Sequence, residues 1–201
     1  MLEALVRKKL GTFNLDAALA GSGFICLAGR NGAGKTTMMK AIAGLDPLGD
    51  GYVRVNGEDV SALPAERRKV VMVTPSSAIP HLEVDSHITW GARLGGNRPS
   101  KGRIDDVKSR LGIDYDGRVG RLSLGMKERV ILATALLSPC RVILVDEAFS
   151  NLHEREAFIG SYRELAKSAG IDVVFSSQVE SDGQLADRLF VIENGSTKKS
   201  D

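Results

Sequence analysis

Residues 29–37, GRNGAGKTT, constrain the fold of this chain more than any other part of its sequence. They fit the pattern G-x-x-x-x-G-K-[ST], whose fixed positions are Gly29, Gly34, Lys35 and Thr36. The run GFICLAG before the loop is typical of a buried strand, and KTTMMKAIAG after it has a helical pattern that ends at Gly44. A glycine-rich turn between a strand and a helix directs backbone N–H groups and the positive end of the helix dipole at one point. The sequence therefore predicts a phosphate cradle.

The loop also predicts how a nucleotide and its metal would be held. Lys35 is expected to reach the β- and γ-phosphates, and the Thr36 hydroxyl is expected to ligate Mg²⁺. The residues expected to contact the nucleotide are Gly29, Arg30, Asn31, Gly32, Ala33, Gly34, Lys35, Thr36 and Thr37.

An acidic pair follows a second apolar run, RVILVDE at 141–147. In parallel sheets ligands bind at the carboxyl ends of the strands, so Asp146 is predicted to supply the second Mg²⁺ contact. Glu147 points to a different side and is predicted to accept a proton from, or orient, the attacking water. A solvated strand end or a helix cap is the alternative interpretation of this pair.

Strands and helices alternate through most of the chain. The apolar runs at 70–73, 171–177 and 188–195 are typical of strands, and the first is continuous, as in strands buried on both faces. Helical patterns cover 127–137, which is amphipathic, and 155–170. This order predicts an α/β fold with a mainly parallel sheet core flanked by helices.

Three segments depart from this alternation. Residues 51–60 alternate around Asn56-Gly57 and predict an antiparallel ribbon that decorates the surface of the parallel core. Residues 82–120 are polar and glycine-rich, with helical pieces such as 105–112, and predict an inserted helical subdomain. The tail at 196–201, STKKSD, is expected to be frayed.

Composition narrows the class of protein. A chain of 201 residues suits one sizeable core, and 27 basic against 25 acidic residues leave a net charge of +2 without a basic block for nucleic acid. Cys26 and Cys140 lie apart in apolar runs and predict buried thiols. No run approaches the roughly 18 apolar residues of a membrane span, and the N-terminus lacks a signal-peptide core. We expect a reduced, cytosolic protein.

The subclass follows from LSLGMKERVILATALLSPCRVILVDEAFSNL at 122–152, which closely resembles the ABC transporter ATPases. Their LSGGQ signature helix runs into the Asp-Glu strand and a D-loop, and the separation here is 146 − 123 = 23 residues. The stretches LGTFNLD, AIAGLDPLGDGYVRVNGEDVSALPAERRKV and PHLEVDSHITWG resemble the importer branch, most of all the molybdate or tungstate uptake ATPases. The resemblance covers nearly the whole chain.

This resemblance implies a P-loop NTPase of the ABC ATPase type. It implies one domain over 1–201, with an antiparallel β-subdomain, a helical subdomain at about 82–125 and no carboxy-terminal regulatory domain. It further implies an ATPase that uses ATP and Mg²⁺ to drive solute import, of molybdate, tungstate or another oxyanion, through an integral membrane permease.

The resemblance also implies an assembly and a location. The ATP-bound form would be a head-to-tail homodimer in which Ser123 and Gly125 of one subunit bind the γ-phosphate held by the other. The protein would be cytoplasmic and attached to the cytoplasmic membrane face through the permease, with no nucleic-acid partner.

Several positions depart from the family pattern. Leu124 replaces a signature glycine, Met126 a signature glutamine, and His153 stands where the D-loop usually has an aspartate. The glutamine that touches magnesium in relatives is replaced by Pro75, or by Thr74 if the register slips. An aromatic residue for stacking on adenine is also missing, because Phe13 aligns with a core position.

The switch histidine of the family is missing as well. Counting 178 − 170 = 8 residues from Gly170 places Gln178 there as the predicted catalytic residue, whereas counting 187 − 177 = 10 back from Asp187 places Ser177. A glutamine can donate a hydrogen bond to the γ-phosphate but cannot carry charge, which predicts slow hydrolysis.

Two other functions remain as alternatives. The departures suit a regulatory or nucleotide-sensing ABC protein, or the degenerate half of an asymmetric pair. A DNA-repair or chromosome type is disfavoured, because such relatives insert long coiled coils, whereas here 123 − 35 = 88 residues without heptads separate loop and signature.

Overall fold

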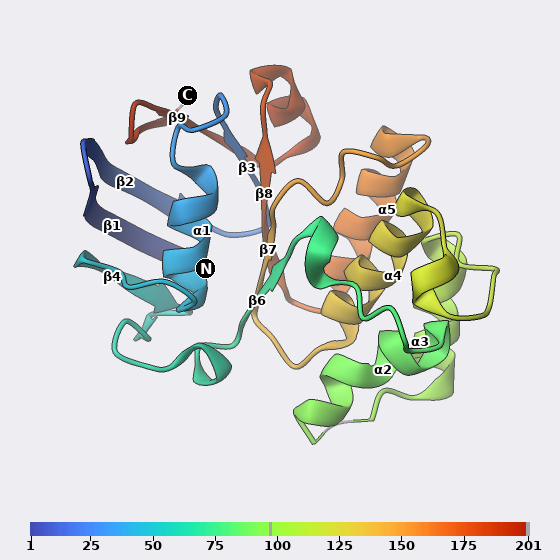
Figure 1. Ribbon diagram of the computed structural model, residues 1–201. Coiled ribbons are helices and arrows are strands. Elements are labelled where there is room, and N and C mark those ends of the chain that lie inside the picture. Colours follow the sequence, from blue (N-terminus) through green and yellow to red (C-terminus); the bar gives the residue numbers. More distant parts are fainter. Residues whose placement is uncertain (97, 200–201) are drawn as a thin grey trace. The chain divides into compact units, whose positions relative to one another are not determined.

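The computed structural model describes residues 1–96 and 98–199, and the chain divides into two compact units (Figure 1). The sheet unit comprises Met1–Met72, Arg141–Asp146 and the chain from Asp172 onward. The helical unit comprises Val73–Cys140 and Glu147–Ile171. The expected single domain with a helical subdomain at about 82–125 stays a prediction. Among the described residues no helix is both long and apolar enough to cross a bilayer.

In the described part of the chain, ten strands form one mixed sheet with the order β5-β4-β1-β2-β10-β9-β3-β8-β7-β6. Pairs β3–β8, β3–β9 and β7–β8 are parallel, whereas β1–β2, β1–β4, β4–β5 and β9–β10 are antiparallel. The strands are β1 Leu2–Leu10, β2 Phe13–Gly21, β3 Phe24–Ala28, β4 Asp50–Val55, β5 Glu58–Asp59, β6 Val70–Val73, β7 Val142–Val145, β8 Asp172–Ser177, β9 Arg188–Glu193 and β10 Ser196–Lys199.

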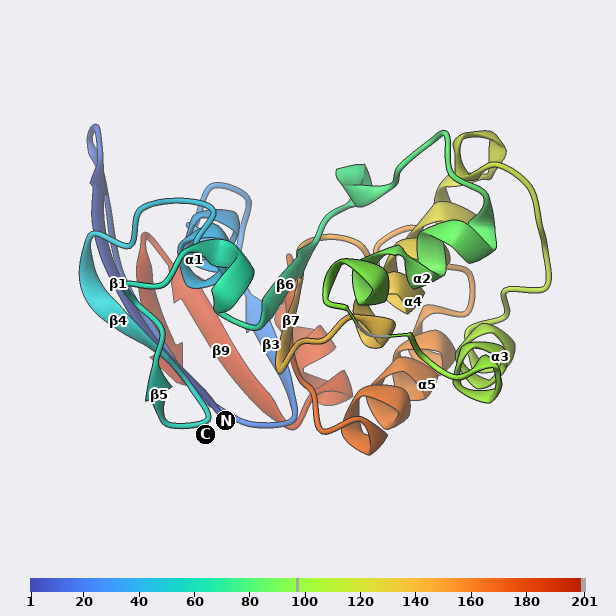
Figure 2. The same ribbon diagram turned by 90° about the horizontal axis from the view of Figure 1, so that it is seen from below.

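Helix α1 (Lys35–Ala43) follows β3 and packs on the sheet, as Figures 1 and 2 show. Its buried residues Met38, Met39 and Ile42 join one hydrophobic cluster with residues of β1, β2 and β4. Gly44 caps the helix in the left-handed conformation that glycine adopts without penalty. The predicted strand, loop and helix around the phosphate pattern are confirmed.

More strands are antiparallel than the sequence predicted, because β1 and β2 pair with each other and β1 pairs with β4. The ribbon β4–β5 forms around Asn56-Gly57 as predicted, but β4 also pairs with β1, and Val53 and Val55 are buried in the core cluster. The prediction of a surface decoration is therefore wrong. β1 carries alternating buried residues, a period-2 signal typical of a half-buried strand.

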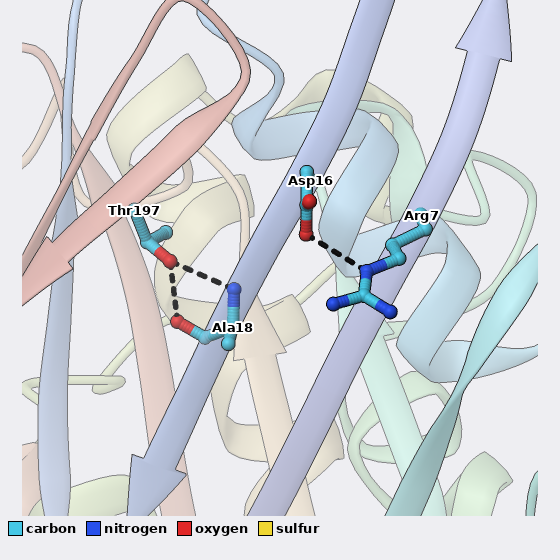
Figure 3. A network of polar contacts seen from close by, with 4 residues as sticks. All are labelled: Arg7, Asp16, Ala18 and Thr197. Atoms are coloured by element: carbon cyan, nitrogen blue, oxygen red, sulfur yellow. Dashed lines mark hydrogen bonds and ion pairs between the residues drawn. The ribbon is translucent and has the colours of Figure 1, made fainter.

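The tail prediction is also wrong for residues 196–199, which form β10; residues 200 and 201 lie outside the described chain. β10 pairs with β9 and meets β2, where the Thr197 hydroxyl bonds both the N–H and the C=O of Ala18 at 2.7 Å (Figure 3). On the neighbouring pair Arg7 lies 3.2 Å from Asp16. The Thr197 side chain thus bonds backbone groups of β2 that water would otherwise have to satisfy.

Two further details of burial differ from expectation. Val70, Val71 and Met72 are half-buried, because β6 lies at the edge of the sheet rather than inside it. The segment predicted as an amphipathic helix is buried on all sides from Val130 to Leu137, as expected for a helix in the middle of a core. Cys26 and Cys140 are buried, as predicted.

The helical unit contains four α-helices in its described residues. They are α2 Val84–Leu94, α3 Lys101–Arg110, α4 Leu124–Leu137 and α5 Arg155–Ser168. Short 3₁₀ helices are η1 Ala65–Arg67, η2 Pro75–Ser77, η3 Val119–Arg121 and η4 Glu180–Leu185, of which η2 and η3 belong to this unit. The prediction of helical structure within 82–120 is confirmed.

A buried histidine ties three segments of the helical unit together. His87 on α2 accepts a hydrogen bond from the Ile79 N–H at its Nε2 (3.1 Å), so Nδ1 carries the proton and donates to Thr134 on α4 (2.8 Å). His87 is 2% exposed, and its burial lowers the pKa of the imidazole below 6.5. The neutral ring is therefore part of the packing of α2 on α4.

This arrangement predicts that the helical unit loses stability in mild acid. Because the folded-state pKa is lowered, the unfolded chain takes up a proton first, and stability falls as pH drops below 6.5. The loss is at most about 1.4 kcal/mol per pH unit. Urea unfolding between about pH 7 and about pH 5 measures it. His87→Gln should make the unfolding free energy depend less on pH, while His153→Gln, at an exposed position, should leave that dependence unchanged. Equal slopes for the unmodified chain and both variants would contradict the role given to His87.

Candidate functional site

The glycine-rich loop in the sheet unit begins at the carboxyl end of β3. Its Gly29 N–H donates to the carbonyl of Ser177, the last residue of β8, at 3.0 Å. Gly34 is the N-cap of α1 and has φ 111°, and a Cβ added to it would lie 2.8 Å from Leu15 Cδ1. Gly32 has φ 79° and no atom within 4 Å of an added Cβ. The loop backbone therefore packs closely on the core at Gly34, whereas there is free space beside it at Gly32.

Lys35 lies over this loop. Its ammonium donates to the carbonyl oxygens of Gly29 (2.6 Å) and Arg30 (3.1 Å), and the residue is only 5% exposed. The cation is therefore held at the loop carbonyls, within the first turn of α1, where the helix presents N–H groups without helical acceptors. An anion placed there meets both the ammonium and the helix dipole.

A buried carboxylate links the loop to the sheet. Asp146 follows β7 and is 5% exposed. Its Oδ2 accepts from the Thr36 hydroxyl at 2.7 Å, and its Oδ1 accepts from the Ser176 hydroxyl at 2.8 Å. The structure thus brings together the two residues predicted to hold the metal, and adds Ser176, which the sequence interpretation did not single out.

These residues fit a magnesium nucleotide. A hydroxyl and a carboxylate are oxygen donors of the kind Mg²⁺ prefers, and Mg²⁺ is usually held by few protein ligands together with substrate phosphates. The open side of Gly32 leaves room beside the loop backbone, as a phosphate cradle requires. Thr36 and Asp146 would hold the metal, and Lys35 with the loop N–H groups would hold the phosphates.

The two candidates for the switch position have different surroundings. The hydroxyl of Ser177, which is 7% exposed, is hydrogen-bonded to Asp182 and to the carbonyl of Val179, and it accepts from the Val179 N–H. Gln178 comes next and is exposed. Ser177 therefore fixes the turn after β8, while the Gln178 side chain faces solvent at the end of the strand that contacts Gly29.

The predicted signature residues lie at the start of α4 in the helical unit. Ser123 is the N-cap and accepts from the Met126 N–H at 3.3 Å. Leu124 is 48% exposed on the first turn. A Cβ on Gly125 would lie 2.9 Å from the carbonyl oxygen of Asn151, so the backbone of α4 and the predicted D-loop approach closely only because glycine stands there.

A buried acidic residue, which the sequence analysis did not single out, also joins α4 to the predicted D-loop. Glu128 is fully buried, and its carboxylate accepts from the backbone N–H (3.2 Å) and side-chain amide (2.8 Å) of Asn151. Burial raises the pKa of Glu128, and the two Asn151 donors act against this rise. Glu128 stands between the charged residues Lys127 and Arg129, so no local signal marked it as buried.

Other predicted residues of the helical unit have local surroundings that can be stated. Glu147 is exposed with φ 60°, and its carbonyl accepts from the Ser150 N–H at 3.2 Å. His153 is exposed. Thr74 caps η2, where its N–H donates to Ser77 Oγ at 3.0 Å and its hydroxyl lies 2.8 Å from Ser76 Oγ. The TPSS stretch is thus a hydroxyl-bonded turn.

Phe13 belongs to the sheet unit. It is half-buried against the core cluster, with its ring edge 3.4 Å from the position of a Cβ on Gly34. This agrees with a core role. The absence of an adenine-stacking aromatic residue stays a prediction.

Comparisons with known proteins show the family to which the chain belongs. The family model described as ABC transporter matches residues 13–150. A molybdate/tungstate import ATP-binding protein of Archaeoglobus fulgidus is 32% identical over 96% of this chain and 84% of its own length. A molybdenum import ATP-binding protein of Rhizobium meliloti is 34% identical over 99% of this chain and 59% of its own. A spermidine/putrescine import ATP-binding protein of Pseudomonas fluorescens is 32% identical over 90% of this chain and 53% of its own.

Solved structures match the fold. One of them, an ATP-binding subunit of an ABC transporter, has a TM-score of 0.81 at 20% identity, covering 98% of this chain and 89% of that one. A dimeric bacterial ABC transporter cassette has a TM-score of 0.81 at 19% identity, covering 99% and 98%. The chain spans little more than half the length of several of the curated relatives it matches.

The loop geometry predicts that Gly34→Ala is costly. The new side chain would meet Leu15 at 2.8 Å with a backbone of φ 111°, which L residues rarely adopt. We expect a loss of about 1–3 kcal/mol in the free energy of unfolding, measured in urea. Gly102→Ala is the matched control, since nothing lies within 4 Å of its Cβ in α3. It should be neutral or stabilise by up to about 1 kcal/mol. Equal stabilities of the two variants would contradict the strained conformation at Gly34.

Proposed function

Because the chain belongs to the ABC transporter family of ATP-binding proteins, we propose that it binds Mg-ATP at the glycine-rich loop and hydrolyses it to drive solute import through a membrane permease. The observation that carries this proposal is the Thr36–Asp146 hydrogen bond of 2.7 Å at the start of α1, beside the Lys35 ammonium. At this one place the Lys35 ammonium and the positive end of the α1 dipole suit phosphate, and the oxygens of Thr36 and Asp146 suit the metal.

The proposed roles follow from the position of each group. Lys35 exchanges its bonds to loop carbonyls for bonds to phosphate oxygens, which a cation favours because phosphate carries full charge. Bound magnesium would neutralise charge on the outer phosphates. Glu147, one residue beyond Asp146, accepts a proton from or orients the attacking water.

Gln178 is proposed as the hydrogen-bond donor at the switch position. It is exposed at the end of β8, whereas the Ser177 hydroxyl is engaged by Asp182 and Val179. An amide donates a hydrogen bond without carrying charge, so slow turnover is expected.

The family also suggests the assembly. Ser123 and Gly125 at the start of α4 are proposed to meet the γ-phosphate bound by a second copy in a head-to-tail dimer. The helix N-terminus supplies N–H donors for an anion. A cassette of the same fold that is dimeric supports dimerisation. The protein would then lie at the cytoplasmic membrane face, attached through its permease.

The proposed solute is molybdate, tungstate or another oxyanion. Two of the relatives described above are named for molybdenum or molybdate/tungstate import and the third for spermidine/putrescine import, so the support comes from similarity alone. Uptake of labelled molybdate by vesicles that hold the chain with a molybdate permease tests it, and absence of ATP-dependent uptake would refute it.

A regulatory or nucleotide-sensing role is the second candidate. The TPSS turn favours it, because the Thr74 hydroxyl bonds the hydroxyls of Ser76 and Ser77 at the place where the family resemblance implies a glutamine. Pro75 offers neither a side-chain donor nor a backbone N–H. Such a protein would bind ATP without turnover.

Turnover of Mg-ATP by the purified chain separates these functions. We expect measurable release of phosphate that Glu147→Gln lowers by about 10²–10⁴, since the amide cannot act as a base. Lys35→Ala should lose nucleotide binding itself. Absence of turnover in the unmodified chain at high protein concentration, with ATP binding intact, would favour the regulatory role.

The same assay assigns the switch position. Gln178→Ala should lower turnover by up to about 10²–10³ if its amide is the γ-phosphate donor. A normal rate for Gln178→Ala with a large loss for Ser177→Ala would transfer that role to Ser177.

A further inference from the structure

The carboxylate of Asp146 lies between two hydroxyl groups from different parts of the chain. Thr36, on the first turn of α1, donates to Oδ2 at 2.7 Å, and Ser176, in β8, donates to Oδ1 at 2.8 Å. Asp146 is 5% exposed and Ser176 is 7% exposed. Water therefore has little access to the Ser176 bond, and the protein itself must supply the donors that a buried carboxylate requires.

The strand register places Ser176, and neither of its neighbours, at this carboxylate. β7 and β8 are parallel, with Val145 paired to Phe175, so the next residue of each strand is Asp146 and Ser176. Successive side chains of a strand point to opposite faces. Consistent with this, the hydroxyl of Ser177 bonds Asp182 instead.

We propose that Ser176 is a positioning residue, which holds the Asp146 carboxylate in the orientation that receives the magnesium ion of Mg-ATP. This inference rests on the proposed function and adds to it a residue outside the motifs of the loop, the Asp-Glu pair and the signature. Ser176 does not touch metal or nucleotide in this role. It acts through Asp146.

The argument concerns what happens at each carboxylate oxygen. If the Thr36 hydroxyl ligated a metal ion, its oxygen would serve the ion and its bond to Asp146 Oδ2 would have to adjust. The bond from Ser176 to Oδ1 comes from β8 and does not involve the Thr36 hydroxyl. It would therefore restrain the orientation of the carboxylate when a metal ion is held. Partners that orient a metal ligand commonly contribute about 10–100-fold in metal affinity.

Three variants isolate this role. Ser176→Ala removes the donor and leaves Oδ1 without its hydroxyl partner. Ser176→Thr keeps a hydroxyl on the same strand position and should restore metal binding. Ser168→Ala is the matched control, since its hydroxyl donates to the Leu165 carbonyl near the end of α5, in the other unit of the chain.

The readout is Mn²⁺ binding to the full chain with a non-hydrolysable ATP analogue, followed by electron paramagnetic resonance. We expect Ser176→Ala to weaken Mn²⁺ binding by about 10–100-fold, with near-normal affinity in Ser176→Thr and Ser168→Ala. Affinity for the nucleotide in EDTA should be the same in all four proteins. A merely structural role of Ser176 would lower nucleotide affinity with and without metal.

The outcomes distinguish this inference from the proposed function. Equal Mn²⁺ affinity in the unmodified chain and in Ser176→Ala overturns the positioning role and leaves the proposed function standing. The positioning role is also overturned if Ser176→Ala loses nucleotide binding in EDTA, or no longer unfolds cooperatively on heating, and Ser176→Thr does not restore the lost property. Failure of the unmodified chain to bind the nucleotide at all overturns the proposed function instead.

Discussion

The hydrogen bond between Thr36 and Asp146 joins residues 110 positions apart, and the candidate site depends on it. It exists because β3 and β7 both run parallel to β8, so their carboxyl ends lie on the same side of the sheet. The loop after β3 and the acid after β7 are thereby brought to one place. Gly29, through its bond to the Ser177 carbonyl, attaches the start of the loop to the strand between them.

Polar groups of the protein contact both charged side chains of this site. The Asp146 carboxylate accepts hydrogen bonds from the hydroxyls of Thr36 and Ser176, and the Lys35 ammonium donates to the carbonyls of Gly29 and Arg30. Hydrogen bonds of this kind are what buried charged groups require. The site therefore presents a carboxylate that suits a cation and an ammonium that suits an anion.

The sequence predicted the elements whose signals are local. The loop pattern, the helix after it, the strand before Asp146 and the turn at Asn56-Gly57 each depend on adjacent residues, and all were found. Errors occurred where burial depends on distant partners. The tail strand β10 needs β9 and β2 beside it, and half-burial of β6 follows from its place at the sheet edge.

The same distinction explains which site residues were missed. Ser176 and Glu128 belong to no short pattern, and their roles arise from contacts to Asp146 and Asn151 across the fold. His87 likewise joins α2 to α4 through Thr134. Glu128 lies between Lys127 and Arg129, His87 follows Ser86, and Ser176 precedes Ser177, so no local pattern marks them as buried. Such residues are buried with partners because an unpaired polar group in a core is costly.

Calorimetric titration of ATP, with Mg²⁺ and with EDTA, tests the central claim that this loop and Asp146 together bind a magnesium nucleotide. The unmodified chain and Asp146→Asn are compared, since the amide keeps the size of the side chain and removes its charge. The account predicts that Mg²⁺ tightens ATP binding by the unmodified chain and has little effect on Asp146→Asn. An equal effect of Mg²⁺ on both proteins would contradict it.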